Sequence, residues 1–138
     1  MRDADIRFDL PEINTWRLCL KRVTQQDVVG MVEDWEAHGY RFGCVCIDDG
    51  WTSGGLLGDW RPDPARFPDL RGLVDWIHAR GYAARLWVAP CQAHPGTEIH
   101  RRAAPQDFLG DAAGNPCFFT GLGTYRLDPR RPLGAAHI

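Results

Sequence analysis

The chain has 138 residues, a length at which a single domain can bury a sizeable core. Hydrophobic residues make up 44% of the sequence and charged residues 25%, and six tryptophans are present, which is typical of a globular protein and excludes disordered and fibrous classes. The net charge is only −2 at pH 7, and the arginines are interspersed with acidic residues. Nucleic acid and anionic membranes are therefore disfavoured as partners.

The lengths of the apolar runs and the pattern of cysteines indicate the cellular compartment of the protein. The longest apolar runs, such as residues 86–90, have the length of strands, and the N-terminus lacks the apolar stretch of a signal peptide, so we expect a cytoplasmic protein. The cysteines form an odd set without a C-x-x-C pair, which argues against a disulfide framework and a tetrahedral zinc site and favours buried free thiols. They are Cys19, Cys44, Cys46, Cys91 and Cys117.

The first predicted elements are a strand, a helix and a second strand. We expect a short strand over residues 16–20, and Thr24 and Asp27 then form the T-x-x-D signature of a helix N-terminus. Four apolar residues share the spacing of one helical face: Val28, Val29, Val32 and Trp35. Gly39 stands where a left-handed C-cap would be needed, and the nearly continuous apolar run of residues 42–47 predicts a strand buried on both faces.

A second unit repeats this plan. Residues 70–77 have helical spacing, Gly81 follows as a cap, and residues 83–88 form the next apolar run. The alternation of strand and helix predicts a parallel α/β sheet.

The rest of the chain has a different character. From residue 90 to 127 the pattern gives way to Pro, Gly and polar residues, with a hairpin predicted around residues 111–115. Such a long excursion is usually functional. Residues 132–138 predict the first turn of a third helix.

Polar and aromatic side chains follow the predicted strands. In parallel α/β folds ligands bind at the carboxyl ends of strands, where Asp48, Asp49 and Trp51 follow one apolar run and Trp87 lies at the end of the next. Carboxylates accept hydrogen bonds from sugar hydroxyls, and an indole packs against the C–H face of a pyranose. The combination predicts substrate-binding residues for a carbohydrate. The alternative is that Asp48 and Asp49 only end a strand in an Asp-Gly turn.

The two aspartates are not expected to cleave a glycosidic bond. A retaining glycosidase places its nucleophile and its acid about 5 to 5.5 Å apart around the scissile bond. Neighbours such as Asp48 and Asp49 point to opposite faces of a strand. We therefore assign no catalytic residue in this chain.

A metal site is a second possibility for the same aspartates. Asp48 and Asp49, taken with His94 and His100, superficially resemble the metal site of polysaccharide deacetylases, in which an Asp and two His hold a divalent metal. In that family the histidines lie one helical turn apart, whereas here they are six positions apart with Pro95 between them. A metal-dependent deacetylase remains an alternative, and we expect no metal ligands.

Four segments, in their order and spacing, resemble the retaining α-glycosidases of glycoside hydrolase families 31 and 36, which are related (β/α)₈ barrels. These segments are residues 47–51, 58–60, 66–68 and 86–90. The resemblance extends over nearly the whole chain, from about residue 14 to residue 132.

Other segments distinguish the two families. Residues 107–119 and 125–129 look like the stretch that family 31 places between its third strand and third helix, whereas residues 14–16 and 48–51 are reminiscent of family 36. Family 31 members related to α-galactosidases carry a similar Asp-Asp pair. In family 36 the position after Pro90 holds Glu, but here it holds Cys91. These features favour family 31.

The resemblance implies a fold and a site. The fold is a partial (β/α)₈ TIM barrel with the first three β-strands, two helices and a long loop after the third strand, so that residues 1–138 are one incomplete domain. In these families the residues that resemble Asp48 and Asp49 bind hydroxyls of the sugar in the −1 subsite, and the Trp that resembles Trp87 lines it. The nucleophile and the acid/base follow the fourth and sixth strands, beyond residue 138, and a β-sandwich domain normally precedes the barrel.

The resemblance also implies an activity. The parent would be a retaining exo-α-glycosidase that acts on oligosaccharides or glycosides without a cofactor, and this chain would be an inactive fragment of it that needs the remainder of the barrel. The alternative is a non-catalytic carbohydrate-binding remnant.

Overall fold

A computed structural model describes residues 10–137, which form two compact units. Unit 1 comprises the described part of Met1–Gly55 together with Pro62–Trp87, and unit 2 comprises Leu56–Arg61 with the described part of Val88–Ile138.

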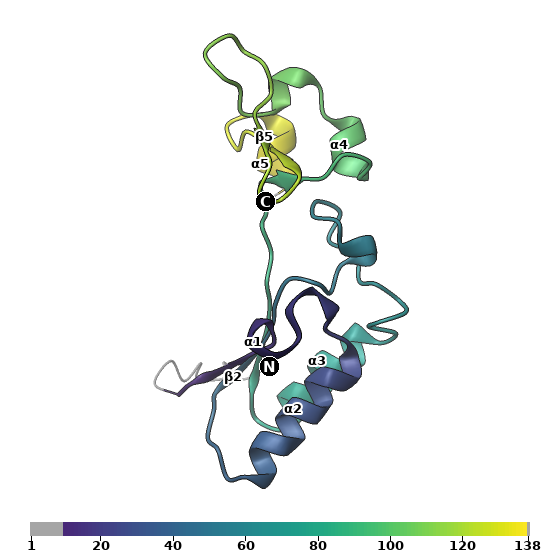
Figure 1. Cartoon of the computed structure of the whole chain (residues 1–138), viewed down its shortest axis with the longest axis vertical. Helices are drawn as coiled ribbons and strands as arrows, with labels where there is room; N and C mark the ends of the chain where they lie inside the picture. The colour runs from purple at the N-terminus through teal and green to yellow at the C-terminus, as the bar shows by residue number, and fades with distance from the viewer. Residues whose placement is uncertain (1–9, 138) are drawn as a thin grey trace. The chain divides into compact units, whose positions relative to one another are not determined.

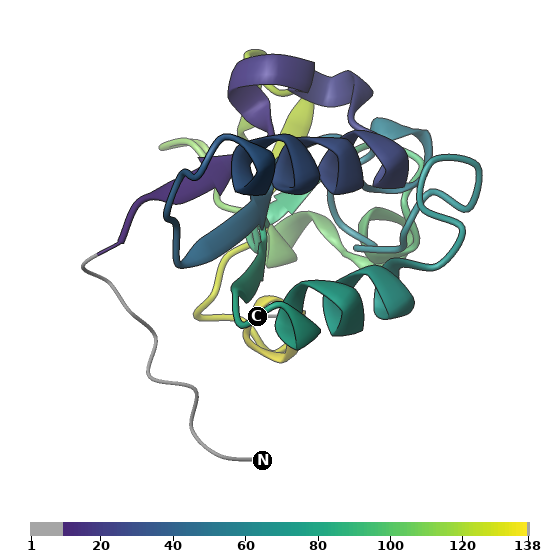
Figure 2. The ribbon, with the colours of Figure 1, turned by 90° about the horizontal axis from the view of Figure 1, so that it is seen from below.

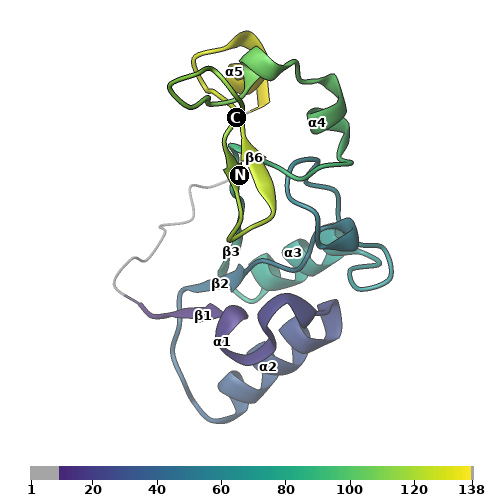
Figure 3. The same ribbon diagram turned by 45° about the horizontal axis from the view of Figure 1, so that its top comes forward.

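Unit 1 is built on a parallel sheet with the strand order β1-β2-β3. The strands are β1 (Glu12–Asn14), β2 (Cys44–Ile47) and β3 (Ala83–Leu86). Two helices, α2 (Gln25–Ala37) and α3 (Leu70–Ala79), lie side by side along the same face of this sheet (Figures 1 and 3). Three parallel strands alternating with two helices confirm the predicted parallel α/β arrangement, with the expected number of strands and helices.

The predicted position of the first strand was wrong. Residues 16–20 fold instead into a helical turn, α1 (Trp16–Cys19), which leads into the 3₁₀ helix η1 (Leu20–Arg22). Leu18 is 66% exposed and Leu20 is 51% exposed, so the apolar residues of this segment do not enter the core. The buried Ile13, opposite Val45 in the neighbouring strand, takes that place.

Helix α2 begins and ends as its sequence predicts. The Thr24 hydroxyl accepts a hydrogen bond from the Asp27 N–H, and the Asp27 carboxylate accepts one from the Thr24 N–H, which completes a capping box. Val28 and Val32 are fully buried, and Gly39 follows the helix with φ 72°.

No helix among residues 10–137 is long and apolar enough to cross a membrane.

The core of unit 1 fills the space between the sheet and the two helices. Each fully buried aliphatic side chain there contributes about 1.5 to 3 kcal/mol of transfer free energy. From the sheet and from the two helices these side chains are Ile13, Val45, Ile47, Val28, Val32, Leu73 and Ile77. Phe42 stacks on Tyr82 with 4.0 Å between ring centroids, which closes one end of this core.

The cysteines are free thiols, but only Cys46 is buried, whereas Cys117 is exposed and the other three are partly exposed. The expectation that all of them are buried was therefore wrong. Burial in strand β2 raises the pKa of the Cys46 thiol to about 12, so this group stays protonated at neutral pH.

Unit 2 contains a small antiparallel sheet with the strand order β4-β6-β5, coloured green to yellow in Figure 2. Its strands are β4 (Gln92–Ala93), β5 (Phe118–Phe119) and β6 (Thr124–Arg126), and its helices are α4 (Glu98–Arg102), η3 (Pro105–Asp107) and α5 (Pro132–His137). A further 3₁₀ turn, η2 (Ser53–Gly55), belongs to unit 1. The hairpin predicted around residues 111–115 is present, because Gly110 pairs with Pro116 across it. Helix α5 also occupies the predicted position.

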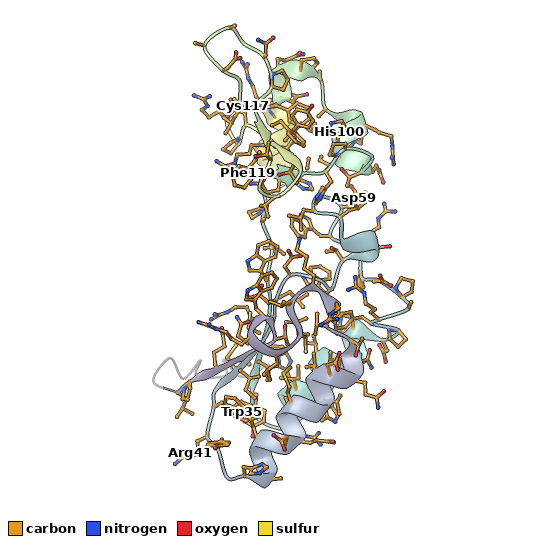
Figure 4. All side chains as sticks on the ribbon, in the orientation of Figure 1. Trp35, Arg41, Asp59, His100, Cys117 and Phe119 are labelled. Carbon is orange, nitrogen blue, oxygen red and sulfur yellow. The ribbon has the colours of Figure 1, made fainter. Side chains whose placement is uncertain are left out.

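The core of unit 2 is a small cluster around an aromatic group. Ala93, Ile99, Phe108 and Leu127 form the buried cluster. The ring of His100, labelled in Figure 4, lies 5.6 Å from the ring of Phe108 and 5.3 Å from that of Tyr125. A histidine that the sequence offered as a metal ligand is therefore part of the packing.

We expect the stability of unit 2 to depend on Asp128 at low pH. The Arg130 guanidinium contacts both carboxylate oxygens, at 2.9 and 2.8 Å, and with the Arg130 N–H it lowers the pKa of Asp128 to about 2. Because this pKa lies below the unfolded value of about 3.9, the stabilisation is complete above about pH 4 and is lost as the pH falls toward 2. Chemical denaturation between pH 5 and 2, monitored by hydrogen exchange of the Leu127 amide, should show this loss of stability. The variant Asp128→Asn should be less stable at pH 5 and should change less across the range; an equal loss in both proteins would contradict the assignment.

Candidate functional site

The carboxyl ends of the three parallel strands meet at one edge of unit 1. The Thr15 N–H donates to the Cys46 carbonyl at 3.1 Å, and the Trp87 N–H donates to the Ile47 carbonyl at 2.9 Å. The ladder therefore continues to the residues that directly follow β1 and β3, and Asp48 directly follows β2 between them. The predicted residues Asp48, Asp49 and Trp87 thus lie at the same edge of the sheet.

Asp48 is fixed from strand β1 and from its own neighbour. The Asn14 side-chain amide donates to Asp48 Oδ2 at 3.0 Å, and the Asp49 N–H donates to Asp48 Oδ1 at 2.7 Å. The Asp48 N–H donates in turn to the Thr15 hydroxyl at 2.9 Å. The carboxylate is partly exposed and each oxygen can accept further bonds, so Asp48 has a fixed orientation and remaining acceptor capacity.

Asp49 is buried and only half satisfied. The residue is 5% exposed, and its Oδ2 lies 3.0 Å from the ammonium nitrogen of Lys21. Its Oδ1 is buried and accepts no hydrogen bond from any of residues 10–137. A buried acceptor without a donor costs about 1 to 3 kcal/mol, so this oxygen is suited to a donor supplied by a ligand.

The backbone of Lys21 is held by two contacts within unit 1. Gly50, with φ 124°, packs against it so closely that a Cβ there would lie 2.7 Å from the Lys21 carbonyl oxygen. The Arg66 guanidinium donates to the same oxygen at 2.6 Å and is itself paired with Asp63 at 3.2 Å. Leu20 enters this turn with φ 49°, which is unusual for a residue with a side chain. The position of the Lys21 ammonium is thus defined by its surroundings.

The tryptophans of the site differ in accessibility. Trp51 is 3% exposed and its indole N–H donates to the Trp87 carbonyl at 2.9 Å, so the ring is part of the core. Trp87 is partly exposed, and Trp16, which follows β1, is 38% exposed. Trp87 and Trp16 are therefore the tryptophans at these strand ends with surface that a ligand can touch, whereas Trp51 supports the end of β3.

The two histidines proposed for a metal site have other partners. The Nδ1 atom of His94 accepts a hydrogen bond from the Leu57 N–H at 2.6 Å, and His100 packs in the aromatic cluster of unit 2. No group of three or more His, Cys, Asp or Glu side chains in the described part of the chain could hold a metal ion.

Two surface hollows are lined by residues outside the predicted site. One, of about 180 Å³, belongs to unit 2 and is lined in part by Asp59, labelled in Figure 4; the other, of about 480 Å³, lies beside the start of α2. Burial would raise the pKa of Asp59, but hydrogen bonds from the N–H groups of Glu98 and Ile99 outweigh it and hold the pKa below its ordinary value. Neither hollow is lined by Asp48, Asp49, Trp51 or Trp87.

The sequence prediction missed four supporting residues: Asn14, Thr15, Lys21 and Arg66. The first two directly end and follow β1, so the rule about strand ends would have found them if that strand had been placed correctly. Lys21 and Arg66 have no local motif, because their contacts with Asp49 and with the Lys21 carbonyl join segments that are distant in sequence.

Comparison with known families and sequences gives a consistent result. The family described as "Glycosyl hydrolases family 31 TIM-barrel domain" matches residues 13–126. A curated relative, the "A type blood alpha-D-galactosamine galactosaminidase" of Flavonifractor plautii, is 32% identical over 93 residues, which are 64% of this chain and 8% of that protein. "Alpha-galactosidase 2" of Pediococcus pentosaceus is 29% identical over 96 residues, 65% of this chain and 13% of that protein. The chain thus spans a small part of the length of these relatives.

Solved structures resemble the chain over nearly all of its length. The GH36 α-galactosidase AgaA from Geobacillus stearothermophilus superposes with a TM-score of 0.78 at 25% identity, covering 96% of this chain and 18% of that one. The α-galactosidase TtGalA from Thermus thermophilus, solved with p-nitrophenyl α-D-galactopyranoside, gives a TM-score of 0.76 at 27% identity, covering 93% of this chain and 26% of that one. AgaA has also been solved as a variant in complex with stachyose.

Proposed function

Because this chain belongs to the family of glycosyl hydrolase family 31 TIM-barrel domains, which it matches over residues 13–126, we propose that it is part of an exo-acting, retaining α-glycosidase. In that enzyme it would supply part of the sugar-binding subsite. The observation that carries the proposal is the buried carboxylate of Asp49, whose Oδ1 accepts no donor from residues 10–137, at the carboxyl end of a parallel strand. That edge is where barrel enzymes bind their substrates.

The role of each residue follows from its surroundings. Asp48, held by Asn14, and Asp49, held by Lys21, accept hydrogen bonds from hydroxyls of the terminal sugar. Trp87 offers its partly exposed ring to the C–H face of that sugar. Trp51, with its ring buried, acts by positioning the end of β3.

We propose that these aspartates bind and do not attack. The two carboxylates come from adjacent residues, and Asp49 donates its own N–H to Asp48, so they do not flank a bond from opposite sides as a retaining pair must. The nucleophile and the acid/base are then contributed by sequence outside these 138 residues. Residues 1–138 form part of one barrel domain, in which the part of unit 2 that follows β3 is the excursion after the third strand. The family match supports this because it extends across both units.

The relatives favour an α-linked galactosyl sugar as the substrate. The Pediococcus pentosaceus relative, AgaA and TtGalA are named as α-galactosidases, the Flavonifractor plautii relative is named as an α-D-galactosamine galactosaminidase, and a variant of AgaA was solved with stachyose. Within the clan, the match of residues 13–126 favours family 31, whereas the AgaA structures belong to family 36.

The test is hydrolysis of p-nitrophenyl α-glucoside, α-galactoside and α-xyloside by the 138-residue chain and by the protein extended to the next in-frame stop codon. We expect cleavage by the extended protein alone, with the galactoside cleaved fastest. Cleavage by the 138-residue chain would mean that its own carboxylates do the chemistry, and cleavage of none of the glycosides by either protein would contradict the proposed activity.

A further inference from the structure

The site contains the only lysine of the 138-residue chain. The chain has 16 basic residues of the lysine and arginine types, and Lys21 is the single lysine among them. An ammonium is a compact point charge with three donors, whereas a guanidinium is a wide planar fork suited to bidentate contacts. The one lysine stands where a single nitrogen meets a single oxygen of a buried carboxylate, at 3.0 Å.

The Lys21 ammonium remains accessible although it is paired. Its side chain is 49% exposed, whereas that of Asp49 is 6% exposed. Because the backbone of Lys21 is held by Gly50 and by Arg66, the side chain starts from a fixed point. The ammonium has three N–H donors, and the pair with Asp49 joins its nitrogen to a single carboxylate oxygen.

Donors and an acceptor are therefore adjacent at the end of β2. Asp49 Oδ1 lacks a donor from residues 10–137, and the Lys21 ammonium on the same carboxylate has N–H groups to offer. A hydroxyl is the sugar group that donates one hydrogen bond and accepts others through the same oxygen. A hydroxyl placed between the two side chains would satisfy both.

Resting on the proposed function, we propose that Lys21 is a substrate-contacting residue that sets specificity. One sugar hydroxyl donates to Asp49 Oδ1 and at the same time accepts a hydrogen bond from Lys21 Nζ. Asp49 by itself requires only that the ligand donate a hydrogen bond. Lys21 adds the requirement that the oxygen of the donating hydroxyl also accept a hydrogen bond. A sugar that lacks this hydroxyl therefore loses both contacts.

The single lysine makes the contact directly measurable. Lysine labelled with ¹³C at Cε gives one side-chain NMR signal, which belongs to Lys21. In a titration of the 138-residue chain with methyl α-D-galactoside, this signal should shift saturably, and its affinity should equal the affinity measured from saturation transfer to the sugar.

Variants separate the contact from a structural role. Lys21→Met should weaken binding about tenfold, the size expected for losing a hydrogen bond to a charged group. Lys21→Arg keeps the positive charge and serves as the control for a loss of folding. Its thermal midpoint should stay near that of the wild type, and its affinity for the sugar should still be lower. Arg22→Met removes the adjacent exposed cation and should leave binding unchanged. The monodeoxy galactoside that lacks the contacted hydroxyl should bind Lys21→Met and the wild type equally, because the contact is then already absent.

The outcomes distinguish this inference from the function on which it rests. If the wild type binds methyl α-D-galactoside but the Lys21 signal does not move and Lys21→Arg binds equally well, the role of Lys21 is wrong and the sugar site stands. If no glycoside binds the wild type at tens of millimolar, the sugar site itself is wrong for this chain, and the role of Lys21 falls with it.

Discussion

Replacing Gly50 by alanine should destabilise the protein by about 2 to 5 kcal/mol and disrupt the proposed sugar site. The backbone φ of 124° is one that residues with a side chain rarely adopt, and the added Cβ would lie 2.7 Å from the Lys21 carbonyl oxygen and 2.8 Å from its Cα. The strained backbone costs about 1 to 2 kcal/mol and forced overpacking about 1 to 3 kcal/mol. Urea denaturation monitored by tryptophan fluorescence measures the change.

Gly39 provides a matched control for the backbone term. It also has a positive φ, of 72°, but a Cβ there would meet no atom within 4 Å. Gly39→Ala should therefore cost only about 1 to 2 kcal/mol. Equal losses in the two variants would show that the contact with Lys21 is not tight, and the argument that Gly50 fixes the position of Lys21 would fail.

The second large effect is expected at Asp49 and concerns ligand affinity. Asp49→Asn keeps the shape of the side chain but replaces the charged acceptor by a neutral amide. Hydrogen bonds to charged groups contribute about 1.5 to 3 kcal/mol, so the affinity for methyl α-D-galactoside should fall about 10- to 100-fold. Saturation-transfer titration measures it, and the thermal midpoint checks that the variant is folded.

Asp75 serves as the control for the loss of one negative charge. It lies on α3, where it is 62% exposed and pairs with Arg71 one helical turn away. Asp75→Asn should leave sugar affinity unchanged, because exposed helical pairs contribute little and the residue does not follow a strand. A similar fall in both variants would point to net charge as the cause and would contradict the role proposed for Asp49.

Local sequence determined much of the architecture. The capping box of Thr24 and Asp27, the buried face of Val28 and Val32 and the glycine after α2 define that helix from interactions within a few residues. The apolar run that ends at Ile47 is typical of a buried parallel strand, and its length and polarity alone predict that the two aspartates after it lie at a strand end. Short-range chemistry is sufficient where the decisive contacts are close in sequence.

The tertiary structure decided the first strand and the surroundings of Asp49. Residues 16–20 have the apolar content of a strand, but the residues that pair with β2 are Glu12–Asn14, because Ile13 fills the core opposite Val45. Because the strand was predicted to begin four residues too late in the sequence, Asn14 was not identified as the partner of Asp48. A short strand is selected by its neighbours in the sheet rather than by its own sequence.

The sequence by itself therefore determined the class of fold, the boundaries of α2 and the strand end that carries the two aspartates. Only the tertiary structure showed that Asp49 is buried against Lys21, that Gly50 and Arg66 hold the Lys21 backbone, and that the Trp51 ring is internal. The reason is physical: periodicity and capping depend on residues a few positions apart, whereas these contacts join segments up to 45 residues apart, which approach one another only after the sheet has formed.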